Sequence, residues 1–168
     1  ADYSPYGGGM YNESSSPTVS NCSFTNNFAQ YGGAGMYNQS SSPTVSNCSF
    51  TDNRSEFGDG GGMCNISSSP TVSNCSFTGN RAGRGCGMFN IHSSPRVTDC
   101  SFTANSPGYG SGMYNASSSP LVSNCSFTRN NAYYGGGMYN ATSSSPTVSN
   151  CSFTGNSAST GAGMDNVD

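Results

Sequence analysis

A unit of 25–27 residues repeats along the entire chain, and this period restricts the possible fold more than any other sequence feature. The most constant part of the unit reads SSPTVSNCSFTGN at residues 68–80, and close copies of it recur in every unit. A methionine that follows a glycine-rich stretch keeps the same period. A fixed period of this length is typical of stacked repeats and not of a domain with one central core. We therefore predict a single repeat array over residues 1–168.

Short β-strands fit the unit better than helices do. The chain has 23 glycines and 8 prolines, and they divide every unit at motifs such as SSSP and GGGM, where a helix would be interrupted. The runs between them, such as TVSNCSF and GMYN, are β-branched, aromatic and alternating, which indicates strands. Each unit is thus predicted to form one coil of an all-β parallel β-helix, a β-solenoid of about six coils with three short strands per coil, spaced about 4.8 Å apart.

Residues that recur in each coil are expected to stack on their own copies. Side chains alternate along a strand, so the apolar residues of each unit are predicted to face the interior. In the first coil these are Met10, Val19, Cys22, Phe24 and Ala29. The odd step from valine to cysteine requires a turn at Ser20–Asn21.

Three columns of asparagine, which begin at Asn12, Asn21 and Asn27, run through the units. Asparagine tolerates turn dihedral angles and bonds the local backbone, so the columns are predicted to occupy the three corners of each coil. Their amides can also bond one another between coils and form ladders.

The motifs GGxGM and FTxN resemble the GGA[ILV] and FxxN repeats of the chlamydial polymorphic outer membrane proteins. All six units match FxxN, from Phe24–Asn27 to Phe153–Asn156. The glycine motif differs, since methionine replaces the branched residue and glycine or cysteine often replaces alanine. The resemblance implies a right-handed parallel β-helix and a surface adhesin. A resemblance of fold does not by itself determine function.

Composition argues against several classes of function. Charged residues make up 8% of the chain, its net charge is −3 and its basic residues are all arginine, so a nucleic-acid partner is not expected. No apolar run approaches the length of a membrane span.

We expect no catalytic residues, no cofactor and no metal, and the chain is predicted not to be an enzyme. His92 is interpreted as a solvated turn residue. The acidic segment around Asp52, Glu56 and Asp59 is either a calcium loop or, as we favour, a solvated loop.

The eight cysteines suggest an oxidising compartment. Six of them form one inward column, where in-register strands aim neighbouring thiols in the same direction, so a stack of buried thiols is favoured over disulfides. Cys64 and Cys86 lie outside this column, about three residues out of register in adjacent coils. A disulfide between them would need a bent loop, and both states stay open here.

Two surface rows are candidate interaction sites. The aromatic residues that follow methionine are predicted to face outward, where they either shield the backbone, as we favour, or bind sugars or another rod: Tyr11, Tyr37, Phe89, Tyr114 and Tyr139. A second aromatic column precedes the glycines: Tyr6, Tyr31, Phe57, Tyr109 and Tyr134. An unbroken Ser-x-Thr row resembles the threonine-rich faces of solenoid ice-binding proteins. Its threonines are Thr25, Thr51, Thr78, Thr103, Thr128 and Thr154.

Asn-x-Ser/Thr motifs make several asparagines candidate glycosylation sites, unless they point inward. The candidates are Asn12, Asn38, Asn53, Asn65, Asn115 and Asn140.

The predicted function is that of an extracellular or cell-surface structural or adhesive β-helix, with cell-surface, matrix or glycan partners. The alternatives are an ice-binding protein and a carbohydrate-binding β-helix. Because neither end shows a divergent capping unit, head-to-tail association is also predicted, with Asp165 and Asp168 as edge charges that oppose it.

Overall fold

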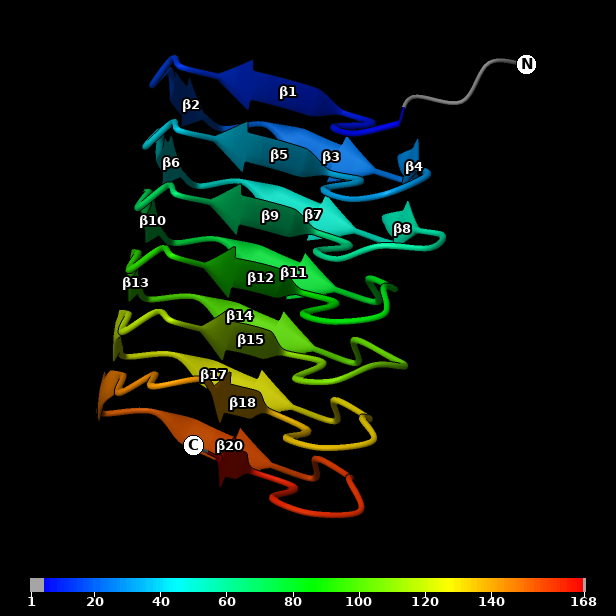
Figure 1. Ribbon diagram of the computed structural model, residues 1–168, viewed down its shortest axis with the longest axis vertical. Coiled ribbons are helices and arrows are strands. Elements are labelled where there is room, and N and C mark those ends of the chain that lie inside the picture. The colour runs from blue at the N-terminus through cyan, green and yellow to red at the C-terminus, as the bar shows by residue number, and fades with distance from the viewer. Residues whose placement is uncertain (1–4, 168) are drawn as a thin grey trace.

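The structure, a computed structural model, describes residues 5–167 as a rod of stacked β-coils (Figure 1). Each complete coil adds one strand to each of three parallel sheets, which we name the Met, Val and Phe sheets after their inward residues. The predicted all-β parallel solenoid of about six coils is confirmed. No helix of the described residues is long and apolar enough to cross a membrane.

The Met sheet has seven strands and forms one wall of the rod. Its strands are β1 (Met10–Glu13), β5 (Met36–Gln39), β9 (Met63–Ile66), β12 (Met88–Ile91), β15 (Met113–Ala116), β18 (Met138–Ala141) and β21 (Met164–Asn166). A serine- and proline-containing turn leads from each of the first six strands to the Val sheet.

The Val and Phe sheets have six strands each and follow one another along the chain. The Val sheet consists of β2 (Thr18–Ser20), β6 (Thr44–Ser46), β10 (Thr71–Ser73), β13 (Arg96–Thr98), β16 (Leu121–Ser123) and β19 (Thr147–Ser149). The Phe sheet consists of β3 (Ser23–Thr25), β7 (Ser49–Thr51), β11 (Ser76–Thr78), β14 (Ser101–Thr103), β17 (Ser126–Thr128) and β20 (Ser152–Thr154). Two further short strands, β4 (Phe28–Ala29) and β8 (Arg54–Ser55), pair beside the first coils.

Every repeated residue pairs with its own copy in the next coil. In the Phe sheet, Phe50 pairs with Phe77 and Phe77 with Phe102. Their rings stack face to face with centroids 4.7–4.8 Å apart and interplanar angles of 3–4°. This separation is the rise of one coil, and it agrees with the spacing of neighbouring β-strands.

The interior is filled by four columns of methionine, valine, cysteine and phenylalanine. Phe50, Phe77, Phe102 and Phe127 are completely buried, as are the central methionines and valines. Ala29 is also buried. The predicted inward positions are therefore confirmed, with Met10 half-buried and Cys22 exposed in the first coil.

The asparagine columns depart from the prediction of three corners. The column of Asn12 lies within the strands of the Met sheet and points inward, where Asn38 Nδ2 donates to Asn65 Oδ1 at 2.8 Å. The column of Asn27 also forms a buried ladder, as between Asn53 and Asn80 at 3.0 Å. Burial of an amide is tolerated here because each one is hydrogen-bonded to its neighbours.

Two of the three columns do lie at corners, since that of Asn27 directly follows the left-handed residue Asn26, with φ of 55°, at the end of the Phe sheet. Asn21, with φ of 55°, adopts the left-handed conformation between the Val and Phe sheets, a conformation that asparagine accepts more readily than most residues. The corner after the Met sheet is formed instead by residues such as Ser40, with φ of 50°. A third buried ladder, formed by serines, supports that corner, since Ser41 N donates to Ser68 Oγ at 2.9 Å.

Candidate functional site: a polar groove above a thiol column

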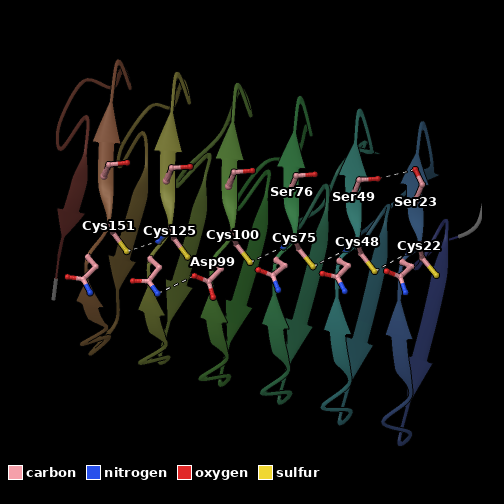
Figure 2. Close-up of a pocket in the computed structure, with 18 residues that line it drawn as sticks. Cys22, Ser23, Cys48, Ser49, Cys75, Ser76, Asp99, Cys100, Cys125 and Cys151 are labelled. Carbon is pink, nitrogen blue, oxygen red and sulfur yellow. Dashed lines mark hydrogen bonds between the residues drawn. The ribbon is translucent and has the colours of Figure 1, made fainter.

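A groove runs along the rod between the Val and Phe sheets and is lined by all six coils (Figure 2). Each coil contributes the same three consecutive residues, an asparagine or aspartate, a cysteine and a serine. Asp99 is the single charged residue among the eighteen that line it. Asn124 Nδ2 donates to Asp99 Oδ1 at 3.1 Å. The groove is therefore an almost uncharged surface that repeats with every coil.

The local sequence explains where the groove lies. Val45 and Phe50 both point inward although they are five residues apart, and the left-handed residue Asn47 lies between them, with φ of 52°. This residue bends the chain at the boundary of the two sheets. The odd spacing in the sequence predicted the turn, but not the groove that six such turns form together.

Thiols form the floor of the groove. Cys48, Cys75, Cys100 and Cys125 are each 3% exposed, whereas Cys22 is exposed and Cys151 half-buried in the end coils. The backbone N–H of Cys48 donates to Cys75 Sγ at 3.4 Å, and Cys75 Sγ donates to the Ser73 carbonyl at 3.1 Å. The same pair of distances recurs around Cys48 and Cys125. The thiols thus share one orientation, and the predicted stack of buried thiols is present.

All eight cysteines are free. Cys64 and Cys86 are both buried, and Cys86 Sγ lies within hydrogen-bonding distance of the carbonyl oxygens of Ala82 and Pro107, at 3.3 and 3.2 Å. The sequence left both a disulfide and two free thiols as alternatives for Cys64 and Cys86, and the structure has the free thiols. Burial raises the pKa of Cys64 well above its ordinary value and that of Cys86 to about 11.

Neighbouring thiols of the column influence one another's ionisation. Interaction with Cys100 lowers the pKa of Cys75 to about 7 and also lowers the pKa of Cys125. The interactions with Cys125 and Cys75 raise the pKa of Cys100. Cys75 and Cys125 are therefore the thiols that ionise more readily, and Cys100 between them stays protonated.

The predicted Ser-x-Thr row forms the outer face of the Phe sheet, beside the groove. Ser76 pairs with Ser101 and Thr78 with Thr103, and the register is kept through Thr25, Thr51, Thr128 and Thr154. Ser23 Oγ and Thr25 Oγ1 lie 2.9 Å apart, within hydrogen-bonding distance. The central threonines are half-buried and those of the end coils are exposed. The sequence predicted this array of hydroxyl groups correctly.

The aromatic residues that follow methionine were predicted to be exposed, and this prediction is wrong for most of them. Tyr37, Phe89 and Tyr114 are only 2–8% exposed, and Tyr139 is half-buried, whereas Tyr11 is 45% exposed. The glycine-rich segment before each methionine folds over these rings. The rings form a second hydrophobic cluster with Cys64, which we call the lateral cluster.

The second aromatic column is interrupted. Its in-register positions are Tyr6, Gly32, Asp59, Arg84, Tyr109, Tyr134 and Thr160. Arg84 forms a bidentate ion pair with Asp59, at 2.8 and 2.7 Å, and its guanidinium lies 5.1 Å from the centroid of the Phe89 ring. Tyr31 and Phe57 are exposed but lie outside this register. The exposed aromatic residues of the loops therefore do not form one continuous column.

The six predicted glycosylation sites are also corrected. Asn12, Asn38, Asn53, Asn65, Asn115 and Asn140 are at most 6% exposed. Their side-chain amides donate hydrogen bonds to the next coil, as in Asn115 Nδ2 to Asn140 Oδ1 at 2.8 Å. A glycan on this nitrogen would have no space in the folded rod and would break the ladder.

The acidic segment is occupied by arginine contacts. Arg54 forms an ion pair with Glu56 at 2.5 Å, and Asp59 is held by Arg84. Within residues 5–167, no group of three or more metal-binding side chains gathers at one point. His92 is an exposed turn residue with φ of 49°, as interpreted from the sequence.

No curated protein and no solved structure matches the chain. One family model does match, that of the right-handed β-helix region, over residues 3–158. This match covers most of the chain and gives the hand of the solenoid seen in Figure 1. The chain belongs to the right-handed β-helix family.

Proposed function

We propose that the chain is an extracellular, non-enzymatic β-helix with a structural or adhesive role at a cell surface or in a matrix. The observation that carries this proposal is the groove, in which one nearly uncharged set of groups is repeated by all six coils. Such a surface suits many equivalent weak contacts with an extended partner. It does not concentrate different chemical groups at one point, as a reaction centre requires.

The chemistry of the groove favours a neutral, hydroxyl-rich partner such as a surface glycan. Asparagine amides and serine hydroxyls both donate and accept hydrogen bonds, and Asp99 is the one charge among them. Contacts repeated along one rod act together, so that weak individual contacts add up to strong attachment. The resemblance to surface adhesins agrees with this role.

Adhesion by immobilised protein tests the proposal. The chain is coupled to beads, and attachment to glycan-coated surfaces is compared for two triple variants. The first fills the groove with Ser76→Tyr, Ser101→Tyr and Ser126→Tyr. The second places the same three side chains on the exposed face of the Val sheet, as Thr44→Tyr, Thr71→Tyr and Thr147→Tyr. We expect the first variant to lose attachment and the second to keep it; equal attachment by both would reject the groove as the adhesive site.

Ice binding is a second candidate, favoured by the strict register of the Ser-x-Thr row beside the groove. A flat array of hydroxyl groups with one fixed repeat can order water in a regular layer. Thermal hysteresis and the shape of ice crystals in solutions of the unmodified protein test this candidate. Ordinary crystal growth without hysteresis would exclude it.

Head-to-tail association stays a prediction. The edges of β1–β3 and of β19–β21 are the outermost strand edges among the described residues. Asp165 accepts a hydrogen bond from Thr160 Oγ1 at 2.6 Å, and Asp168 lies outside the described residues. Light scattering over a range of concentrations distinguishes fibres from monomers.

A further inference from the structure

We propose that the thiol column at the floor of the groove binds soft, closed-shell metal ions, each held in a linear arrangement by two thiolates from adjacent coils. This binding activity goes beyond the adhesive role. It rests on the spacing of the thiols, on their common orientation and on the groove above them.

The spacing of the column fits two metal–sulfur bonds in line. Phenylalanine rings in adjacent coils are 4.7–4.8 Å apart, which is the rise per coil. A zinc–thiolate bond is about 2.3 Å long, and two bonds of that length in line span about 4.6 Å. A linear S–metal–S unit therefore has the length of the step between neighbouring coils, and it would replace the N–H···S hydrogen bond that now links them, such as that from Cys48 N to Cys75 Sγ.

The sulfur atoms repeat with the same rise because all the cysteines adopt one orientation. The distances from the backbone N–H to the next sulfur are 3.4 Å at Cys22, Cys48, Cys75 and Cys125. The sulfur lies 3.1–3.2 Å from the carbonyl two residues earlier in all six coils. Figure 2 shows the sulfur atoms in one file, each directed toward a neighbouring coil.

The donor set selects ions that need only two ligands. Thiolates prefer soft metal ions. A tetrahedral ion such as Zn(II) needs four ligands, whereas the described residues offer no group of three or more metal-binding side chains around one point. The groove runs along the whole cysteine column, and the cysteines of the two end coils, Cys22 and Cys151, are open to it.

The charge balance favours a divalent ion. When Hg(II) binds, two thiols lose their protons to solvent and two sulfur–mercury bonds form, so the complex is neutral. A monovalent ion held in the same way would leave a net negative charge beside the buried valine and phenylalanine columns. A buried charge without a partner is costly. At a pH well below the pKa of Cys75, each bound Hg(II) ion should therefore release two protons.

Six thiols in the column, taken two per ion, give three binding sites per chain. Adjacent coils must supply the two thiolates of one site, so the arrangement of the remaining cysteines determines how many ions are bound. The number of cysteines alone does not.

The experiment uses mercuric chloride as the probe, on the whole chain in a background of Cys64→Tyr and Cys86→Ser. Other coils carry these residues at the equivalent positions, Tyr37 and Ser111. Two double variants, each with four column cysteines, are then compared. Cys22→Ser with Cys48→Ser leaves four consecutive thiols, whereas Cys48→Ser with Cys125→Ser leaves one adjacent pair and two isolated thiols.

One isolated thiol can hold mercury as RS–Hg–Cl, so the protein is desalted in the presence of a competing monothiol, which removes mercury held by a single protein thiol. We then expect the background protein to retain three ions per chain, the first double variant two, and the second one. Absorption from sulfur-to-mercury charge transfer and proton release should fall in the same ratio, while circular dichroism keeps its β-sheet signal. Equal metal content in the two double variants would overturn the proposal, as would loss of the β-sheet signal on binding. X-ray absorption at mercury in the background protein is an independent test. The proposal requires two sulfur atoms bound to each mercury ion, and four bound sulfur atoms would overturn it.

Discussion

The two faces of the Met sheet carry two different hydrophobic clusters. The inward face contributes methionine to the main core in every coil. The outward face contributes to the lateral cluster, where tyrosine, cysteine and phenylalanine occupy equivalent positions, as in the register Tyr37, Cys64 and Phe89. The same strands thus present a column of one residue type on one side and a mixed column on the other.

The difference comes from what covers each column. Three sheets enclose the main core, and its phenylalanine rings also lie against glycines of the segment before methionine. A Cβ atom at Gly62 would lie 2.9 Å from the Phe77 ring and 2.5 Å from the carbonyl oxygen of Gly87. The lateral cluster is covered by one glycine-rich segment, and the phenolic oxygen of Tyr37 can still reach Gln39 at 3.5 Å. Enclosure by sheets therefore demands identical residues, whereas cover by a single segment tolerates variety.

Removal of a ring from the main core should give the largest effect. We expect Phe77→Ala to lower the free energy of unfolding by about 3–5 kcal/mol, because the rigid stack cannot collapse into the space. Denaturation by urea measures this change. A loss below about 1 kcal/mol would mean that Phe77 does not lie in the core.

Interruption of the inward asparagine ladder should come next. In Asn65→Ala, Asn38 Nδ2 loses its acceptor and Asn90 Oδ1 loses its donor, and both are buried. We expect a loss of about 2–4 kcal/mol from two unsatisfied polar groups. Asn74→Gly, an exposed left-handed corner of the same coil, is the matched control and should change stability by less than about 0.5 kcal/mol. Similar losses of stability in both variants would show that the broken ladder does not cause the loss in Asn65→Ala.

A single hydroxyl group added to each cluster tests the comparison directly. Phe77→Tyr places the group in the main core without a partner, and we expect a loss of about 1–3 kcal/mol. Phe89→Tyr introduces the residue that Tyr114 already provides in the next coil, and the expected change is below about 0.5 kcal/mol. Equal costs at the two positions would remove the distinction between the clusters.

The smallest effect is expected on the outer face of the Phe sheet. Thr78→Tyr changes a half-buried hydroxyl position, and stability should stay within about 0.5 kcal/mol of that of the unmodified chain. If the unmodified protein binds ice, the same substitution should abolish thermal hysteresis. Hysteresis that persists in a stable Thr78→Tyr variant would place the ice-binding surface elsewhere.

Local alternation in the sequence was enough to predict the strands and the main core. Val45, Phe50 and Met63 alternate with hydroxyl, amide or aromatic residues, and each is completely buried. The column of Asn12 could not be placed in the same way, because a polar residue is assigned to the surface unless its partners are known. Those partners lie in neighbouring coils, and the buried ladder becomes visible only when the register is known.

The path of the glycine-rich segment was not predictable from alternation. Gly33, with φ of 59°, brings the backbone onto Tyr37, where a Cβ atom on the glycine would lie 2.6 Å from the tyrosine Cβ. This contact explains why the aromatic column is covered. The groove could not be predicted from alternation either, because it depends on how six turns lie relative to two sheets.

The inward asparagine ladder also gives the rod an electrical direction. From Asn12 to Asn166, every Nδ2 donates to the Oδ1 of the following coil, so the amide dipoles of this column all point the same way. Backbone hydrogen bonds run toward both neighbouring coils, as from Asn47 N to Ser73 O and from Ser49 N to Cys22 O, and largely cancel. Hydrogen bonds in such a chain polarise one another. The ladder therefore has a positive pole toward the C-terminal coil, and two rods placed side by side should prefer opposite directions.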